Sequence, residues 1–241
     1  MLNFASWDAL LRQYVDPQGR VDYYNWKKEQ PQAINNWLKN LEKHIHLPNL
    51  NTDEKLALWI NLYNAFTISG ILERYPIQSI QPKILGIPNW LAFLWFFLFP
   101  AYSFAGKRYS LNQIEHNILR REFPEPRIHF ALVCASIGCP LLRNNAYDPA
   151  SIHQQLDEEA SRFINNPDKV RYDLETGTLY CSKIFKWYRQ DFLQIAPSVP
   201  EYIRTYLKTD AQINSSTPIA YLPYDWNLNQ KPRKSPKKAQ K

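Results

Sequence analysis

The stretch Arg127-Ile-His-Phe-Ala-Leu-Val-Cys-Ala-Ser-Ile-Gly-Cys-Pro140 decides how the rest of the chain is interpreted. An apolar run bounded by turn residues is typical of a strand that is buried on both faces. Two of the chain's three cysteines follow this run, in a turn that contains a glycine and ends at a proline. We therefore predict a buried strand within residues 127–140 and expect the chemistry of the protein at its end.

A long helix is predicted before this strand. Asn51 followed by Glu54 is a helix start, and the apolar run that follows predicts a helix over residues 55–75. Because this helix is apolar nearly all round, the amides of Asn61 and Asn64 must find hydrogen-bond partners inside the protein. They either bond the backbone of neighbouring loops or line the site as substrate-binding groups.

A second helix, over residues 111–121, brings two titratable side chains toward the core. Ser110 and Gln113 form a capping box at its start. Helical spacing places Glu115 inside the apolar arc and His116 at its edge. A buried carboxylate must be neutralised, paired or hydrogen-bonded, so we expect an imidazole or a cation beside Glu115.

The remaining segments predict more helices and a few strands. The predicted helices lie within residues 5–47, 148–164 and 183–192, with a hairpin over residues 170–180 and a last strand from Ile219. Strands and helices that do not alternate regularly predict the α+β class. We expect one domain of helices and antiparallel strands over residues 1–229, followed by a disordered basic tail over residues 230–241.

The net charge of +7 is concentrated in this tail. Six of the 29 Lys and Arg residues lie between Lys231 and Lys241, which leaves 23 cations against 22 anions in the rest of the chain. A nearly neutral body without a basic, aromatic-rich patch does not predict a nucleic-acid groove. The first residues lack the basic and apolar regions of a signal peptide, so we expect a cytoplasmic protein with reduced thiols.

The segment 84–104 is unusually rich in aromatic residues. Its uninterrupted apolar part, Trp90 to Phe99, has ten residues, whereas a membrane span needs about 20. Two interpretations remain. The segment is either a buried helix or flap, or an exposed ridge that contacts a bilayer interface or a protein partner, with the basic tail adding attraction to anionic lipid.

Five sequence blocks, in order along the chain, resemble the domain-of-unknown-function family 547. The blocks are Leu58-Trp-Ile-Asn-Leu-Tyr-Asn-Ala65, Tyr109-Ser-Leu-Asn-Gln-Ile-Glu-His116, residues 128–140, Ser182-Lys-Ile-Phe-Lys-Trp-Tyr188 and Leu222-Pro-Tyr-Asp-Trp-Asn-Leu228. The likeness covers roughly residues 5–229 and implies no particular reaction. A more distant similarity to papain-like thiol enzymes rests on residue types, and it implies a papain-like arrangement with a cysteine nucleophile.

A thiol enzyme of this kind needs a cysteine, an imidazole base, a group that orients the imidazole, and N–H donors for the oxyanion. Cys139, in the turn after Gly138, is the first candidate nucleophile, and Cys134 is the second. On a regular strand His129 and Cys134 would point to opposite faces. The leading triad is therefore Cys139 with His129 and Glu115.

Several alternatives stay open. His116 replaces His129 as the base in the second triad, and Trp187 and Tyr188 are expected to line the cleft with the two asparagines. The cysteines and histidines are alternatively structural residues of the core. Neither a metal nor a cofactor is expected, and a Cys134–Cys139 disulfide lacks the Cys-x-x-Cys spacing of redox enzymes.

Two function classes follow from these residues. The first is a cysteine hydrolase or acyl transferase that acts on a small peptide or amide substrate, including γ-glutamyl or thiol-peptide bonds. The second is a non-catalytic adaptor that reaches a membrane surface or a protein partner through residues 90–99 and the basic tail. The enzyme needs an accessible thiol, whereas the adaptor needs an exposed ridge.

Overall fold

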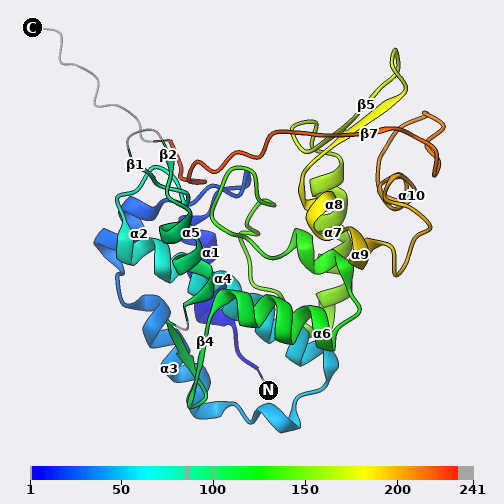
Figure 1. The fold of residues 1–241 in the computed structure, drawn as a ribbon. Coiled ribbons are helices and arrows are strands. Elements are labelled where there is room, and N and C mark those ends of the chain that lie inside the picture. Colours follow the sequence, from blue (N-terminus) through cyan, green and yellow to red (C-terminus); the bar gives the residue numbers. More distant parts are fainter. Residues whose placement is uncertain (1, 85–86, 100, 233–241) are drawn as a thin grey trace, which may run out of the picture.

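A computed structural model of the chain describes residues 2–84, 87–99 and 101–232 (Figure 1). It mixes helices with small sheets, so the predicted α+β class is confirmed. The predicted disordered tail falls mostly on residues 233–241, which lie outside the described residues.

The bounds of the elements are as follows. The α-helices are α1 (Ala5–Tyr14), α2 (Tyr23–Glu29), α3 (Ala33–His44), α4 (Thr52–Arg74), α5 (Trp90–Leu98), α6 (Arg120–Glu122), α7 (Ile152–Ile164), α8 (Ile184–Trp187), α9 (Arg189–Phe192) and α10 (Val199–Arg204). Short 3₁₀ turns are η1 (Leu47–Asn49), η3 (Pro126–Phe130) and η4 (Pro149–Ser151), and η2 (Gln113–Leu119) is a π-helix. The strands are β1 (Lys83–Ile84), β2 (Ile87–Pro88), β3 (Tyr102–Phe104), β4 (Lys107–Tyr109), β5 (Val170–Asp173), β6 (Thr178–Cys181) and β7 (Ile219–Tyr221).

Three small sheets are formed by these strands. β1–β2 and β3–β4 are antiparallel pairs, and β5, β6 and β7 form a three-stranded sheet. The predicted hairpin is confirmed, with Gly177 at φ +66° in its turn. The expectation of antiparallel strands alone is wrong, because β6 and β7 are parallel. The chain passes through α8, α9 and α10 before it returns to the sheet, and such a crossover allows parallel pairing.

The helix α4 is the centre of the larger core. Its predicted capping box is present, since the side chains of Asn51 and Glu54 each accept a hydrogen bond from the other residue's backbone. Buried residues lie on every side of the helix, as predicted. In Figure 1 α4 lies behind the green helix formed by η2 and α6. A second cluster of buried apolar residues is formed by the end of α7, the three-stranded sheet and α8–α10.

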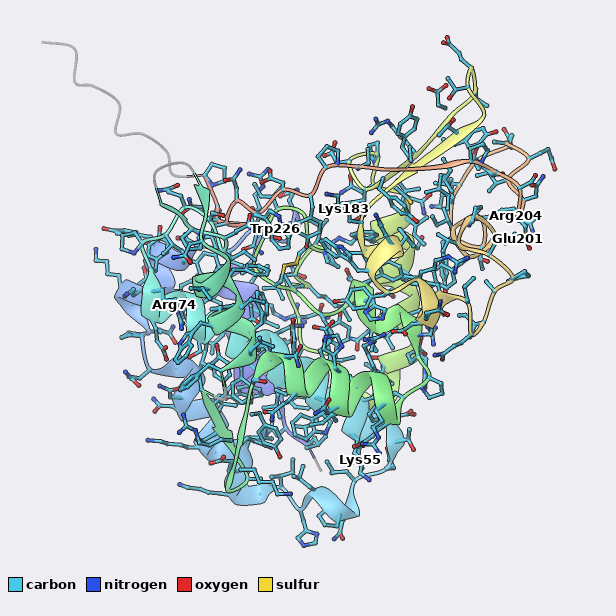
Figure 2. The ribbon with its side chains drawn as sticks, viewed as in Figure 1. Lys55, Arg74, Lys183, Glu201, Arg204 and Trp226 are labelled. Atoms are coloured by element: carbon cyan, nitrogen blue, oxygen red, sulfur yellow. A yellow bond between two sulfur atoms is a disulfide. The ribbon has the colours of Figure 1, made fainter. Side chains whose placement is uncertain are left out.

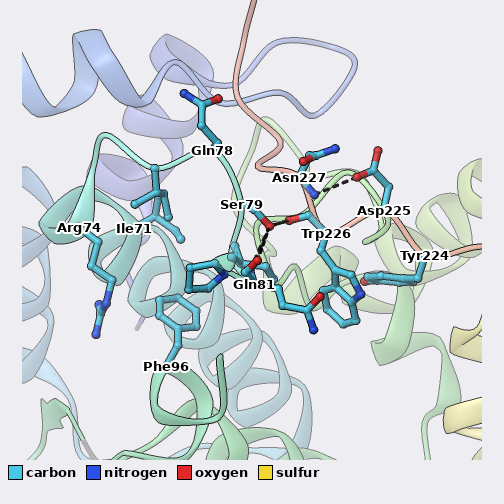
Figure 3. Close-up of a pocket in the computed structure, with 13 residues that line it drawn as sticks. Ile71, Arg74, Gln78, Ser79, Gln81, Phe96, Tyr224, Asp225, Trp226 and Asn227 are labelled. Carbon is cyan, nitrogen blue, oxygen red and sulfur yellow. Dashed lines mark hydrogen bonds between the residues drawn. The ribbon is translucent and has the colours of Figure 1, made fainter. Parts of the chain in front are cut away.

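An extended segment after β7 connects the two parts of the molecule. Residues 222–231, which we call the strap, run from the sheet back across the N-terminal helices (Figure 1; Trp226 is labelled in Figure 2). Isolated bridges pair Asn227 with Ser79, Leu228 with Ser136 and Gln230 with Val21. Figure 3 shows the Ser79 hydroxyl donating to the Trp226 carbonyl at 2.7 Å.

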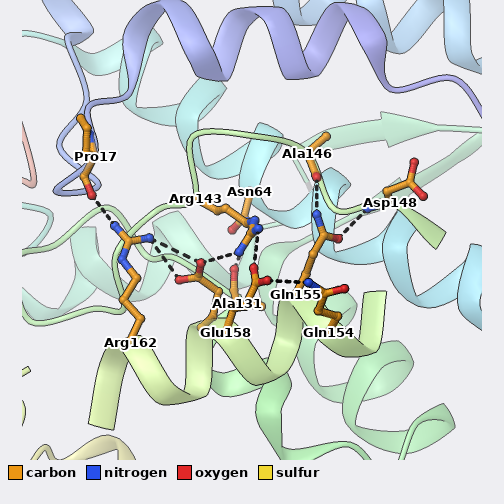
Figure 4. A network of polar contacts seen from close by, with 11 residues as sticks. Pro17, Asn64, Ala131, Arg143, Ala146, Asp148, Gln154, Gln155, Glu158 and Arg162 are labelled. Atoms are coloured by element: carbon orange, nitrogen blue, oxygen red, sulfur yellow. Dashed lines mark hydrogen bonds and ion pairs between the residues drawn. The ribbon is translucent and has the colours of Figure 1, made fainter. Parts of the chain in front are cut away.

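The loop after the cysteines is held on α7 by a polar network (Figure 4). Arg143 donates to Glu159 at 3.0 Å and to Glu158 at 2.7 Å. Arg162 pairs with Glu159 and donates to the Pro17 carbonyl at 2.7 Å. Glu159 is only 3% exposed, so its two arginines supply the compensation that a buried carboxylate requires.

The predicted strand within residues 127–140 is wrong. Residues 126–130 form the 3₁₀ turn η3, and the residues that follow have no strand partner except the single bridge at Ser136. A side chain takes the place of a neighbouring strand here. Asn64 donates to the Ala131 carbonyl at 2.9 Å and accepts from the Val133 N–H at 3.0 Å. An apolar run thus stays buried and hydrogen-bonded without becoming a strand.

Candidate functional site

Two amides of α4 hold both ends of the loop that carries the cysteines. Asn64 bonds the backbone before Cys134, as described above. Asn61 donates to the Tyr147 carbonyl at 2.8 Å and accepts from the Tyr147 N–H at 3.0 Å. The alternative in which these amides bond loop backbone is therefore confirmed. Neither amide lines the cavity described below.

Cys134 and Cys139 form a disulfide, with their Cα atoms 6.1 Å apart. Cys139 is 3% exposed, whereas Cys134 is half-buried. Ala135, between them, has φ +64°, a left-handed conformation that costs a non-glycine residue about 1 kcal/mol or more. The third cysteine, Cys181, is buried in β6, and burial raises the pKa of its thiol to about 12.

The turn at Gly138 does not offer free N–H groups. The N–H groups of Ile137 and Gly138 donate to strap carbonyls, of Asn227 at 2.8 Å and of Asp225 at 2.7 Å, and the Cys139 N–H donates to Ser136 at 3.2 Å. These three N–H groups are therefore not free to bind an anion. The strap takes these donors because it pairs with the loop edge.

Other donors lie at the sulfur atoms instead. The Cys134 N–H points at Cys139 Sγ, 2.9 Å away, and the Tyr224 hydroxyl donates to the same sulfur at 3.2 Å. Cys134 Sγ lies 3.2 Å from the Ser136 hydroxyl and 3.4 Å from that of Tyr224. Burial raises the pKa of Tyr224, so its hydroxyl keeps its proton and remains a donor.

His129 is paired with a carboxylate from the second part of the chain. Its Nε2 lies 2.7 Å from Asp191, and its ring stacks on Tyr188 with centroids 3.8 Å apart. Arg120 donates to both oxygens of Asp191, at 2.6 and 2.7 Å. The expected orienting group, Glu115, makes no hydrogen bond to His129.

The protonation states of this pair follow from their surroundings. Burial lowers the pKa of His129, although its bond to Asp191 acts in the opposite direction. Burial alone would raise the pKa of Asp191, but the hydrogen bonds from His129 and Arg120 hold it below its usual value. Because burial outweighs the bond to Asp191 and lowers the pKa of His129, the ring is neutral and donates through Nε2–H to the ionised Asp191.

The π-helix η2 carries the other two predicted residues. Glu115 accepts hydrogen bonds from the hydroxyls of Tyr188 at 2.5 Å and Tyr63 at 3.2 Å. His116 Nδ1 lies 2.8 Å from Arg120 and accepts its N–H, since a guanidinium only donates. The helix predicted here is present, but its π spacing is a departure from the prediction. Such wide turns occur frequently at functional sites.

One cavity of about 430 Å³ brings most of the predicted residues together. All five predicted catalytic residues line it, as do Trp187 and Tyr188. The other lining side chains include Tyr63, Tyr224, Trp226 and the α5 residues Phe93, Leu94, Phe97 and Leu98. The residues selected from the sequence therefore share this cavity, but the hydrogen-bond partner of His129 is Asp191 and not Glu115.

A second, larger cavity of about 770 Å³ shares part of its lining with the first (Figure 3). Tyr224 and Trp226 line both cavities, while Arg74 and Phe96 line the larger one alone. No cysteine or histidine lines the larger cavity. Of these two cavities, the smaller one is lined by cysteine and histidine side chains.

Sequence reasoning missed Asp191, Arg120 and Tyr224. Asp191 is 62 residues from His129, and no spacing rule predicts that the two side chains meet. A signal was available for Tyr224, because it lies in the Leu222–Leu228 block that resembles the family. A buried tyrosine hydroxyl needs a hydrogen-bond partner, and the sulfur atoms of Cys134 and Cys139 supply one for Tyr224.

The fold and the site define an α+β protein with a cavity lined by sulfur, imidazole and carboxylate groups. The model of a family described as "Protein of unknown function, DUF547" matches residues 47–164, so this part of the chain is similar to that family. The resemblance found in the sequence is thus confirmed, although its last two blocks lie beyond the matched residues. Neither a curated protein nor a solved structure matches the chain, and the papain-like arrangement stays a prediction.

Proposed function

We propose that the protein is a cysteine-dependent hydrolase or acyl transferase that acts on small peptide or amide substrates. One observation carries this proposal. Both sulfur atoms, the His129 imidazole and the Glu115 carboxylate line a single cavity. These are the groups that nucleophilic acyl transfer by a thiol requires.

Cys134 is the nucleophile in this proposal, and Cys139 is its disulfide partner. The sequence alone favoured Cys139, but a nucleophile must be reached by its substrate. Cys134 is half-buried, whereas Cys139 is 3% exposed. The disulfide first has to be opened by a dithiol, which is oxidised to its own disulfide while both cysteines become thiols. The enzyme is therefore active only after reduction.

His129 is the base, and Asp191 is its positioning residue. Because Nε2–H donates to Asp191, Nδ1 is the nitrogen that accepts a proton. The carboxylates of Asp191 and Glu115 both favour the imidazolium that then forms. This division of roles between imidazole and carboxylate follows the logic of the Ser-His-Asp triad.

The reaction then has two halves. The Cys134 thiol passes its proton to His129, and its sulfur attacks the carbonyl carbon of the amide. When the C–N bond breaks, the imidazolium protonates the leaving amine, and a thioester remains on Cys134. Water or an acceptor amine, deprotonated by His129, attacks this thioester and releases the Cys134 thiol. The Tyr224 hydroxyl is the donor for the oxyanion, because it lies 3.4 Å from Cys134 Sγ.

The size and walls of the cavity favour a small substrate. About 430 Å³ suits a small molecule and not a folded protein. Trp187 packs on Tyr224 and Trp226, with centroids 4.8 and 5.9 Å apart, and forms an aromatic wall. Small γ-glutamyl or thiol-peptide amides are the substrates that we would examine first.

Acylation of the reduced protein tests this proposal. Reduced protein is mixed with p-nitrophenyl acetate, nitrophenolate release is followed, and the site of acetylation is mapped by mass spectrometry. We expect a burst of about one equivalent on Cys134, absent in Cys134→Ser and in the oxidised protein, and slowed at least tenfold in Asp191→Asn. His153→Gln, a change at an exposed histidine, should leave the burst unchanged. Acetylation that is no faster on Cys134 than in urea-denatured protein would overturn the proposal.

A further inference from the structure

The helix α5 exposes an apolar stripe to solvent. Leu91, Leu94, Trp95 and Leu98 share one face at i, i+3, i+4 and i+7, and all four are exposed, with Leu91 81% and Trp95 58% accessible. Phe99 extends the stripe, and its ring stacks on Trp95 with centroids 4.2 Å apart. Soluble proteins seldom expose so continuous an apolar patch unless it binds something.

The opposite face of α5 fixes the helix to the body. Phe96 is 6% exposed, and Phe93 packs edge-on against Trp226 of the strap, with centroids 4.9 Å apart. The exposed stripe is therefore part of a packed helix that is apolar on both faces.

Cations lie beside the stripe. The guanidinium of Arg108 lies 6.0 Å from the ring of Phe99, which extends the stripe. Lys107 and Arg108 are exposed on β4, and neither forms an ion pair with the residues that the structure describes. This combination of unpaired cations and exposed aromatic residues is complementary to lipid headgroups above acyl chains.

We propose that the α5 stripe, together with Lys107 and Arg108, docks the protein on an anionic membrane surface. Nine helical residues extend only about 13 Å, against about 30 Å for the apolar layer of a bilayer. Across the described parts of the chain, no helix is both long and apolar enough to cross a membrane. The helix lies in the plane of the interface, with its stripe at the level of the upper acyl chains.

The chemistry of the stripe favours lipid over a protein partner. Protein interfaces carry about one hydrogen bond for each 100–200 Å². The five exposed side chains of the stripe offer a single hydrogen-bonding group, the Trp95 indole N–H. Acyl chains require none, and an indole at the interface finds its partner among headgroups and water. Leu94 and Leu98 of the stripe also line the cavity, whereas Leu91 and Trp95 do not, so a test at Leu91 and Trp95 is independent of the thiol chemistry.

Vesicle sedimentation with the full chain tests this docking. Vesicles of phosphatidylcholine with 30% phosphatidylserine are compared with vesicles of phosphatidylcholine alone, and circular dichroism confirms that each variant is folded. We expect binding to the anionic vesicles, reduced at least tenfold in the double variant Leu91→Ser, Trp95→Ser. The control is Leu174→Ser, which is also 81% exposed but lies in the distant β5–β6 hairpin, and it should bind like the natural chain.

Further variants separate docking through α5 from attraction by the basic tail and from self-association. Lys107→Glu with Arg108→Glu should weaken binding to anionic vesicles at least fivefold, and a chain ending at residue 231 should still bind through α5. Binding that the α5 double variant leaves unchanged would assign the attraction to the basic tail and overturn the proposal. No binding to either vesicle would also overturn it, as would a dimer in light scattering that only the double variant dissociates.

Discussion

His129 shows how one residue links the site to the stability of the fold. Burial keeps its imidazole neutral, while Asp191 and Arg120 fix its orientation. The folded state therefore resists protonation of this ring at a pH where the unfolded chain accepts it. Protonation of the His129 imidazole therefore affects both the free energy of unfolding and the ability of this ring to act as a base.

The first prediction concerns the pH dependence of unfolding. Because the pKa of His129 is lowered by folding, the unfolded state binds an extra proton below the ordinary histidine pKa of about 6.5. Stability should fall as the pH drops from 7 to 5, with a slope approaching 1.4 kcal/mol per pH unit, roughly the value for one proton. Urea unfolding at several pH values measures it. His129→Gln should remove this slope and His153→Gln should keep it; equal slopes in all three proteins would contradict the assignment.

A second prediction compares two neighbouring carboxylates on α7. Glu159 is buried between Arg143 and Arg162, whereas the Glu158 side chain is 44% exposed and shares only Arg143. Glu159→Gln leaves Arg162 without this partner, whereas Arg143 keeps Glu158, and the change should cost about 1–3 kcal/mol of unfolding free energy. Glu158→Gln should cost less than about 1 kcal/mol. Denaturant titration of both variants checks the difference, and equal losses would refute it.

At the scale of elements, the contact between the cysteine loop and the strap decides the shape of the site. Gly138 lies under Tyr224, and a Cβ on it would come within 2.8 Å of that ring and 2.9 Å of the Asp225 carbonyl. The φ of Gly138 is not positive, so the backbone conformation does not require a glycine here. The close approach of the strap does. The strap and the loop can therefore pair only if this position has no side chain.

The third prediction follows from this contact. Gly138→Ala should push the strap away from the loop and destabilise the fold by about 1–3 kcal/mol, the usual cost of overpacking. Thermal unfolding measures the loss. Ala135→Gly, three residues earlier, should stay within about 1 kcal/mol of the natural chain, because φ +64° suits glycine. A Gly138→Ala protein that melts at the natural temperature would show that the contact is looser than described.

Local signals in the sequence predicted several elements well. The capping boxes at Asn51 and Ser110 and the hairpin at Gly177 depend on neighbouring residues only. The strand predicted within residues 127–140 failed for a physical reason. The backbone of these residues bonds to the Asn64 side chain of α4 and to the strap instead of a neighbouring strand. An apolar sequence pattern reveals neither partner.

At the scale of the whole molecule, the site lies where the two core clusters meet. The cysteines, Glu115 and His129 lie between residues 115 and 139, whereas Asp191 and the strap follow residue 190. Residue types and a shared family pattern were enough to select the first group. The second group depends on contacts over 62 to 90 residues, which a single sequence does not encode locally.

The measurement that tests the central claim most directly is the alkylation rate of Cys134 as a function of pH. Reduced Cys139→Ser protein, in which no Cys134–Cys139 disulfide can form, is treated with iodoacetamide between pH 5 and 10. Each cysteine is mapped by mass spectrometry, and buried Cys181 serves as an internal control for an inert thiol.

With the disulfide open, the account predicts that the Cys134 proton passes to His129, and that the thiolate beside the resulting imidazolium reacts with an apparent pKa below the 8.5 of a free thiol. This value should return toward 8.5 in His129→Gln, because the base is then missing, while Cys181 stays unlabelled until the protein unfolds. A Cys134 that titrates near 8.5 whether or not His129 is present, or that does not react at all, would contradict the account.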